Sequence, residues 1–158
     1  RFDGALEKAV TLDVPVCLMH MQASPDVMQD SPSYENVVDD VIGFLLGRVE
    51  EAEKAGIKPN KIMLDPGFGF GKTLQHNLQL LQSLEKFVAL GKPVLVGMSR
   101  KSMLGDILHK PVEQRVYGGV AATTIAALKG ASIIRTHDVS ATCDALKVVQ
   151  ALDAVSKH

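Results

Sequence analysis

Polar and charged residues follow four short apolar runs of the sequence, and their types could bind or activate a small molecule. They are His20 and Gln22, then Asp65, then Ser99, Arg100, Lys101 and Ser102, and finally Arg135, His137 and Asp138. In parallel α/β folds the carboxyl ends of the strands meet at one face, so four such clusters in succession predict a single site. The alternative, that each strand ends where solvent begins, suits one cluster better than all four.

The stretch LDPGFGFGKT, residues 64–73, looks at first like a phosphate-binding loop. The P-loop pattern needs a glycine where this sequence has Pro66, and the dinucleotide spacing of glycines is also absent. Asp65 would repel phosphate and instead suits a ligand with paired N–H donors, such as an amino-substituted nitrogen heterocycle. The glycines would let the backbone approach a flat ligand, with a plain turn as the alternative. On this interpretation Lys72 and Thr73 are the least informative residues of the stretch.

Arg135 and His137 are the candidates for an anion site. They are two residues apart at the end of an apolar run, so both side chains point to the same face of the predicted strand. Arginine offers a planar fork for phosphate oxygens and can also stack on a ring. Residues 99–102 add a cation to the same rim, unless they form a solvated basic loop.

His20 lies between Met19 and Met21. Apolar, sulfur-containing neighbours favour the wall of a pocket over a metal ligand. No spacing of carboxylates or histidines in the sequence indicates a metal site.

Length and composition exclude several classes of protein. The chain has 158 residues and a formal net charge of -1, which predicts one domain over residues 1–158 and no second domain. The basic residues are scattered rather than clustered on a nucleic-acid surface, and no apolar run approaches the roughly 20 residues that span a bilayer. Cys17 and Cys143 have neither disulfide nor zinc spacing. We therefore expect a cytoplasmic protein that binds neither nucleic acids nor membranes.

The hydrophobic pattern predicts alternating strands and helices. Short continuous apolar runs predict buried strands over residues 15–21, 61–67, 93–102 and 132–140. Three- and four-residue spacing predicts helices over residues 4–11, 34–55, 77–90 and 112–129, and a last helix capped by Ser140. Ser33 is the predicted N-cap of the second helix, and Gly56 its stop.

A helix followed by four strand–helix units predicts a parallel α/β sheet with right-handed crossovers. Two architectures fit this order, a doubly wound open sheet and part of a (β/α)8 barrel. A complete barrel needs about 250 residues, so four units would be half of one.

The motifs LDPGFGFGK, GMSRKS and IIRTHDV, preceded by PVCLMHM, closely resemble those of the bacterial dihydropteroate synthases. The resemblance covers essentially the whole chain. It implies a (β/α)8 TIM barrel, of which this chain would be about the last four β/α units. It also implies a transferase of folate biosynthesis that joins 6-hydroxymethyl-7,8-dihydropterin pyrophosphate to p-aminobenzoate, giving 7,8-dihydropteroate and pyrophosphate. Sulfonamides would compete with p-aminobenzoate.

The resemblance implies roles for individual residues. The pterin would be bound by Met19, Asp65, Gly69, Lys101 and Arg135. The p-aminobenzoate would be bound by Phe70, Lys101 and Ser102. The diphosphate would be held by Arg135 and His137, which with Lys101 form the expected catalytic set. The family's reaction is thought to pass through a cationic pterin, and the aniline nitrogen attacks as a neutral amine, so no strong base is needed.

Several family features have no counterpart in this sequence. They are an N-terminal asparagine that helps to bind Mg2+, two further pterin-binding aspartates, another asparagine and two mobile loops. We therefore expect Mg2+ as a cofactor of the full-length enzyme, no metal ligand in this chain, and no turnover by the chain alone. The family is typically a homodimer built on its C-terminal helices, and half a barrel would also leave open sheet edges that favour association.

Two other classes of protein stay open. A pterin-binding methyltransferase barrel would share the pterin pocket, but it would need a corrinoid partner and has no use for a p-aminobenzoate site. A non-catalytic binding or interaction module could also have kept Asp65, Lys101, Arg135 and His137 without turnover.

Overall fold

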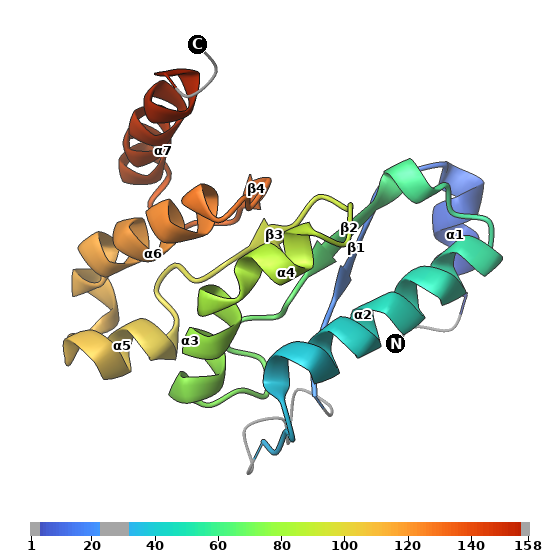
Figure 1. The fold of residues 1–158 in the computed structure, drawn as a ribbon, viewed down its shortest axis with the longest axis horizontal. Coiled ribbons are helices and arrows are strands. Elements are labelled where there is room, and N and C mark those ends of the chain that lie inside the picture. The colour runs from blue at the N-terminus through green and yellow to red at the C-terminus, as the bar shows by residue number, and fades with distance from the viewer. Residues whose placement is uncertain (1–3, 23–31, 156–158) are drawn as a thin grey trace.

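The computed structural model describes residues 4–22 and 32–155, which form alternating strands and helices (Figure 1). The strands are β1 (Val16–Met19), β2 (Ile62–Asp65), β3 (Leu95–Val96) and β4 (Ile133–Ile134). The helices are α1 (Ala5–Leu12), α2 (Val37–Lys54), α3 (Leu74–Gln82), α4 (Leu84–Val88), α5 (Ser102–Leu108), α6 (Val116–Leu128) and α7 (Val139–Val155). Short 3-10 turns at Pro59–Lys61 and Val112–Gln114 precede β2 and α6. Within this part of the chain, no helix is long and apolar enough to cross a membrane.

The strands are parallel, and strands that follow one another along the chain are neighbours. β1 pairs with β2, and β3 pairs with β4. Leu64 forms a bridge with Val94, and its N–H donates to the Pro93 carbonyl at 2.9 Å, so β2 also lies beside the segment that leads into β3. The predicted parallel arrangement of strand–helix units is confirmed.

The register sets the carboxyl ends of the strands level with one another. Met19 pairs with Asp65, and the next residue, His20, donates its N–H to the Asp65 carbonyl at 3.0 Å. In the other pair, the Val96 carbonyl accepts the N–H of Arg135 at 2.9 Å. The polar residues that follow the strands therefore come to one edge of the sheet, as the sequence predicts.

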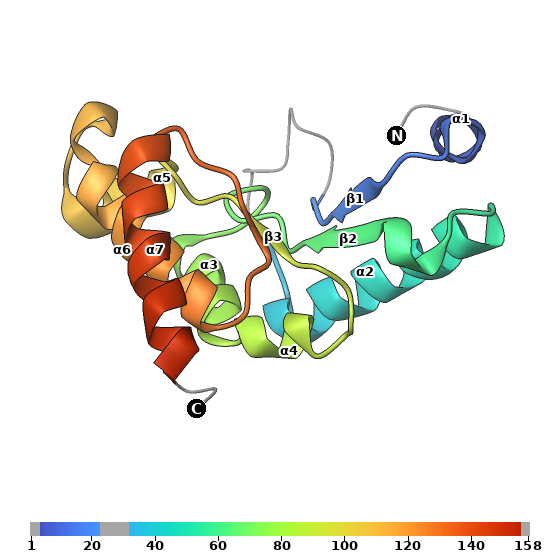
Figure 2. The same ribbon diagram turned by 90° about the horizontal axis from the view of Figure 1, so that it is seen from above.

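The core lies between the strands and the helices that pack on one side of them. Helices α2 and α4 lie on the same side of β2 (Figure 2). The fully buried core residues include Leu45, Ile62, Leu64, Leu80, Leu84 and Phe87. In β1, Leu18 is buried while Cys17 and Met19 are exposed, so the second face of this strand is not covered by the described residues.

Two predicted helix starts are wrong. α2 begins at Val37 and its N-cap is Asn36 rather than Ser33, because the Asn36 carboxamide oxygen accepts the N–H groups of Val38 and Asp39 at 3.1 and 3.3 Å. Serine and asparagine are comparable caps, so the sequence did not decide between them. The last helix begins at Val139, which places Ser140 inside its first turn rather than at its cap.

Other predicted boundaries also change. The helix predicted over residues 77–90 is two helices, α3 and α4, because Ser83 between them departs from helical geometry with φ -103° and ψ 21°. α3 starts earlier than predicted because Thr73 and His76 form a capping box. The run over residues 93–102 contains only the two-residue β3 and ends in α5, a helix that the hydrophobic pattern did not predict.

Candidate functional site

The loop that follows β2, residues 66–71, is called the glycine loop here. Its three glycines all have positive φ, 71° at Gly67, 77° at Gly69 and 60° at Gly71. A Cβ on Gly67 would lie 1.8 Å from the His20 carbonyl oxygen, so only glycine allows this approach to the end of β1. The Gly67 N–H donates to Asp65 Oδ1, and the Gly69 N–H donates to Asn77 Oδ1, each at 2.7 Å. The loop is therefore a defined structure rather than a plain turn.

Asp65 is buried at the carboxyl end of β2, with 8% of its surface exposed. Burial raises the pKa of its carboxyl group, whereas the Gly67 N–H and the charges of Lys101, Arg135 and Lys72 act in the opposite direction. The carboxylate is thus an acceptor in a poorly solvated position, balanced by nearby cations. Such an acceptor suits a neutral or cationic ligand with N–H donors.

Lys101 lies against the glycine loop from the N-terminus of α5. Its Nζ donates to the Phe68 carbonyl and lies 4.4 Å from the centroid of the Phe70 ring. A Cβ on Gly69 would be 3.0 Å from Lys101 Cδ, so this glycine leaves room for the lysine stem. Burial lowers the pKa of Lys101 to about 8, although Asp65 opposes the shift. The structure therefore brings Asp65, Gly69, Phe70 and Lys101 together.

Arg135 lies over Gly97, at the end of β3. A Cβ on Gly97 would lie 3.1 Å from Arg135 Nε, so the absence of a side chain there makes space for the guanidinium group. Arg135 is exposed, and its charge acts on both Asp65 and Lys101. The charge of Arg135, a residue that follows β4, therefore reaches Asp65 at the end of β2 and Lys101 after β3.

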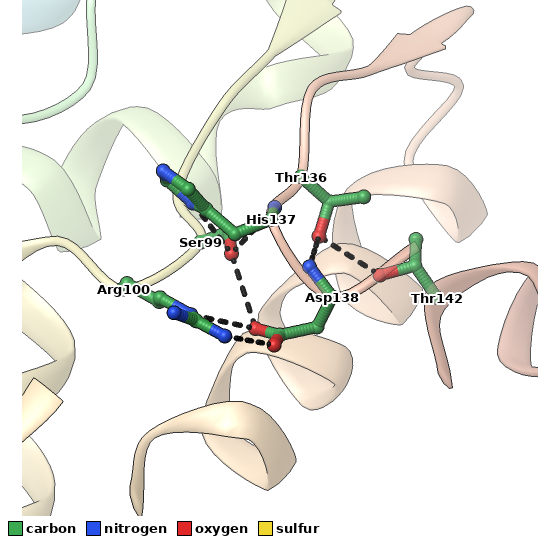
Figure 3. A network of polar contacts seen from close by, with 6 residues as sticks. All are labelled: Ser99, Arg100, Thr136, His137, Asp138 and Thr142. Carbon is green, nitrogen blue, oxygen red and sulfur yellow. Dashed lines mark hydrogen bonds and ion pairs between the residues drawn. The ribbon is translucent and has the colours of Figure 1, made fainter. Parts of the chain in front are cut away.

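His137 belongs to a polar network between the loops after β3 and β4 (Figure 3). Its backbone N–H donates to Ser99 Oγ at 3.2 Å, and its Nδ1 lies 3.2 Å from the same oxygen. Arg100 binds both carboxylate oxygens of Asp138, at 2.6 Å from Nη2 and 3.3 Å from Nε. The Arg100 guanidinium group lowers the pKa of Asp138. The network ties the two loops together next to the predicted anion site.

Asp138 is further held from its own loop. Its N–H donates to Thr136 Oγ1 at 3.2 Å, and that oxygen lies 3.0 Å from Thr142 Oγ1 in α7. Arg100, its partner, has a left-handed backbone with φ 60°, which is uncommon for a residue other than glycine. The ion pair therefore accompanies an unusual backbone conformation in the loop after β3.

The two other predicted site residues lie on the same edge of the sheet. Met19 is the last residue of β1, pairs with Asp65 in the register and is 37% exposed. Ser102 is exposed as the first residue of α5, directly after Lys101. His20 is buried and its ring packs edge-on against Phe44, with centroids 4.9 Å apart, and its place in the wall of a pocket stays a prediction.

Three residues that hold the glycine loop were missed by the sequence analysis. Asn77 receives the Gly69 N–H, and the Tyr34 hydroxyl donates to the Gly71 carbonyl at 2.8 Å. Lys72, predicted to be uninformative, is 5% exposed, and its Nζ lies within 3.0 Å of His20 Nδ1 and of the Gly67 and Phe70 carbonyls. Nothing in the letters Gly-Lys-Thr distinguishes a buried lysine from an exposed one, so the sequence carried no signal for it.

A parallel α/β sheet with a carboxylate, a glycine loop and several cations along its carboxyl edge is the arrangement in which α/β barrels carry small-molecule sites. A profile of the family described as pterin binding enzyme matches residues 1–137. The chain belongs to this family.

The chain is similar to curated dihydropteroate synthases. It is 58% identical to that of Haemophilus influenzae over 148 residues, which are 94% of this chain and 54% of that protein. It is 49% identical to that of Escherichia coli K12 over 148 residues, covering 94% of this chain and 52% of that protein. The chain therefore spans about half the length of the curated relatives it matches.

Solved structures agree with this assignment. A Yersinia pestis dihydropteroate synthase with a sulfonamide drug complex superposes with a TM-score of 0.96 at 50% identity, covering 98% of this chain and 57% of that chain. The Xanthomonas albilineans enzyme in complex with 7,8-dihydropteroate gives a TM-score of 0.90 at 48% identity, covering 98% and 56%. The chain is thus about half of a TIM barrel, which confirms the predicted fold class.

Proposed function

We propose that the protein to which this chain belongs is a dihydropteroate synthase of folate biosynthesis. It joins 6-hydroxymethyl-7,8-dihydropterin pyrophosphate to p-aminobenzoate, and it releases pyrophosphate. The observation that supports this most directly is the placement of Asp65, Lys101 and Arg135 around one glycine loop at the carboxyl edge of the sheet.

The pterin is assigned to Asp65 and the surfaces beside it. A buried carboxylate that lacks full hydration gains most from a ligand that offers paired N–H donors, as an aminopterin ring does. Gly69 permits the ring to approach the backbone, and Lys101 donates to the pterin carbonyl. Met19, exposed beside Asp65 in the register, lines this pocket.

The p-aminobenzoate is assigned to the other side of the glycine loop. The Phe70 ring supports the benzene ring, and Lys101 lies beside it at 4.4 Å from the Phe70 centroid. Ser102 binds the carboxylate of this substrate. Sulfonamides compete for the same place because they carry an aniline ring of the same shape.

Arg135 and His137 are assigned to the departing diphosphate. Breaking the bond between the pterin methylene group and the diphosphate leaves negative charge on the oxygen that departs, and cationic donors stabilise that charge. The p-aminobenzoate nitrogen forms the new bond to the methylene carbon and loses one proton. Ser99 holds the backbone of His137, so the position of the imidazole depends on the network in Figure 3.

Mg2+ is proposed as a cofactor of the whole protein, but the described residues of this chain do not fit it. Residues 4–22 and 32–155 contain no group of three or more His, Cys, Asp or Glu that could hold a metal ion. No step described here is therefore assigned to the metal. We also place the whole protein in the cytoplasm, as a homodimer.

Turnover by the whole protein tests the proposed function. Pterin pyrophosphate and p-aminobenzoate should yield dihydropteroate, and a sulfonamide should inhibit competitively with p-aminobenzoate. The 158-residue chain alone should give no product. A whole protein that binds the pterin but transfers a methyl group instead would overturn the assignment in favour of a methyltransferase.

A further inference from the structure

We propose that Lys72 is a positioning residue, which holds the glycine loop in the shape that places Gly69 and Phe70 and ties this loop to the end of β1 through His20. The proposal deepens the proposed function, because it concerns the wall between the two assigned substrates.

The contacts of Lys72 match the hydrogen-bonding capacity of an ammonium group. Its Nζ lies 2.9 Å from His20 Nδ1, 2.9 Å from the Gly67 carbonyl and 3.0 Å from the Phe70 carbonyl. A lysine ammonium has three N–H donors and no acceptor, so each donor has one partner. Two of these partners belong to the glycine loop, so the lysine closes the loop onto itself.

Lys72 also orients two carbonyl groups of the loop, those of Gly67 and Phe70. The Gly67 carbonyl accepts both the Lys72 ammonium and the Phe70 N–H, the latter at 3.1 Å. With the Gly67 and Phe70 carbonyls directed at Nζ, the loop keeps the turn that presents the Phe70 ring to Lys101. Without the ammonium group, the Phe70 carbonyl would lose this donor and the Gly67 carbonyl would keep only the Phe70 N–H. Losing a donor to a poorly solvated carbonyl is costly.

His20 makes this clamp a link between two strands. Its ring is buried and packs against Phe44 at 4.9 Å and Tyr34 at 6.0 Å, so it offers a fixed acceptor. While Lys72 is protonated it can only donate, so His20 Nδ1 is then the acceptor and the proton of the neutral ring is on Nε2. Burial, followed by the charge of Lys72, lowers the pKa of His20 to about 4, in agreement with a neutral ring.

The charges around the clamp come from several elements. Burial lowers the pKa of Lys72 to about 7, with Asp65 opposing and Lys101 reinforcing the shift. Lys72 in turn acts to lower the pKa of Asp65 and of His76. Loss of the Lys72 charge would therefore raise the pKa of Asp65, the residue assigned to bind the pterin, and would also change the shape of the loop.

Hydrogen exchange at three backbone amides measures the order of the glycine loop and needs no bound ligand. The N–H groups of Gly67, Gly69 and Phe70 are hydrogen-bonded to Asp65, Asn77 and Gly67, so their hydrogen exchange should be slow in the unsubstituted chain. In Lys72→Met their exchange should accelerate by about tenfold or more, while the exchange of α2 amides stays unchanged. No change in the loop, or an equal acceleration throughout the chain, would overturn the proposal.

Lys92 provides a matched control at the other end of the strands. Its side chain is 17% exposed, and its Nζ binds Glu53 and the Pro59 carbonyl, each at 3.0 Å. Lys92→Met removes a comparable clamp on a backbone carbonyl and should leave the glycine loop unchanged. Equal acceleration of the loop amides in Lys72→Met and Lys92→Met would contradict a positioning role.

Two further measurements keep the proposal testable if Lys72→Met does not fold. At a pH between the pKa values of His20, about 4, and Lys72, about 7, the ring-nitrogen chemical shifts of His20 in the unsubstituted chain should show the Nε2–H tautomer. The Nδ1–H tautomer in that range would refute the clamp. Lys72→Arg, which keeps the charge and donors, should retain slow exchange of the three loop amides, whether or not Lys72→Met folds. A failure of the whole protein to bind a pterin would count against the proposed function, whereas the exchange data would still decide the role of Lys72.

Discussion

Two lysines hold backbone carbonyls of the same short loop, and burial lowers the pKa of each. Lys101 binds the Phe68 carbonyl with a pKa of about 8, and Lys72 binds the carbonyls of Gly67 and Phe70 with a pKa of about 7. Groups with such shifts gather at functional sites, where burial and opposite charges act together. Of the two, only Lys101 was predicted, because its motif resembled that of a known family.

His20 should make the chain sensitive to acid. Its pKa is 6.5 in an ordinary setting and about 4 in the folded chain, so between these values the unfolded chain binds more protons. Stability should therefore fall as the pH drops from 6.5 to 4, by an amount on the order of 3 kcal/mol from this group.

The acid sensitivity is measured by urea unfolding of the original chain and of His20→Asn at several pH values. The slope of stability against pH should be smaller in the variant. Asp65, whose pKa is raised, makes the stability of the chain increase as the pH falls, opposite to His20. Both proteins share this contribution, so the difference between their stability curves isolates the effect of His20. Parallel curves from pH 6.5 to 4 would refute a buried neutral His20.

Asp138→Asn should weaken the binding of pyrophosphate. The substitution removes the charge that pairs with Arg100 at 2.6 Å, which loosens the loop that carries His137. Because solvent screens a partly exposed ion pair, the effect should be modest, a fall in affinity of about two- to fivefold in calorimetry. Asp144→Asn, which loses only the exposed pair with Lys147, is the control, and an equal effect of both would argue against the network.

At the scale of elements, caps and glycines position the site. α2 starts where Asn36 caps it, and the glycine loop exists because positive φ values and a close approach to β1 leave no room for side chains. The cap is tested by comparing substitutions of Asn36 and Ser33, and the glycine loop by comparing substitutions of Gly67 and Gly47.

Asn36→Ala should destabilise the chain by about 1 kcal/mol, because the N–H groups of Val38 and Asp39 lose their acceptor. Ser33→Ala, at the position first predicted as the cap, should have little effect. Thermal unfolding of both variants checks this prediction, and a larger loss in Ser33→Ala would restore the original assignment.

Gly67→Ala and Gly47→Ala should act in opposite directions. An added Cβ at Gly67 meets the His20 carbonyl oxygen at 1.8 Å, whereas at Gly47, in α2, nothing lies within 4 Å. Unfolding in urea should show a loss of stability at Gly67 and a gain of about 0.5–1 kcal/mol at Gly47. A tolerated Gly67→Ala would mean that the loop does not approach β1 as described.

The sequence predicted element types well because the apolar runs and helical periodicity are local features. It failed at Ser33, Ser140 and residues 77–90, where several residues could cap or break a helix and tertiary contacts decide. The site residues came largely from long motifs rather than from spacing. Lys72 was missed because its burial depends on His20, which is 52 positions away in the sequence.

At the scale of the whole molecule, the chain is about half of a barrel, and it exposes apolar surface. On α7, Val148, Leu152 and Val155 are 71%, 59% and 73% exposed, and their spacing places them along one face of the helix. Exposed apolar stripes of this kind mark surfaces for association. This exposed apolar stripe on α7 supports the proposal that the protein is a homodimer.

Val148→Glu should shift the chain toward the monomer in sedimentation velocity experiments, because a charge would be buried in the interface. Gln150→Glu adds the same charge to an exposed polar position of α7 and should leave association unchanged. Monomers of the unsubstituted chain at every concentration would contradict association through this stripe.

Binding of a pterin through Asp65 is the central claim, and calorimetry of the whole protein with 6-hydroxymethylpterin tests it most directly. Asp65→Asn should weaken binding by at least about tenfold, since hydrogen bonds to a charged group contribute about 1.5–3 kcal/mol. Asp106→Asn, at an exposed position of α5, should bind as the unsubstituted whole protein does. Equal affinity of the Asp65→Asn variant and the unsubstituted whole protein would contradict the account.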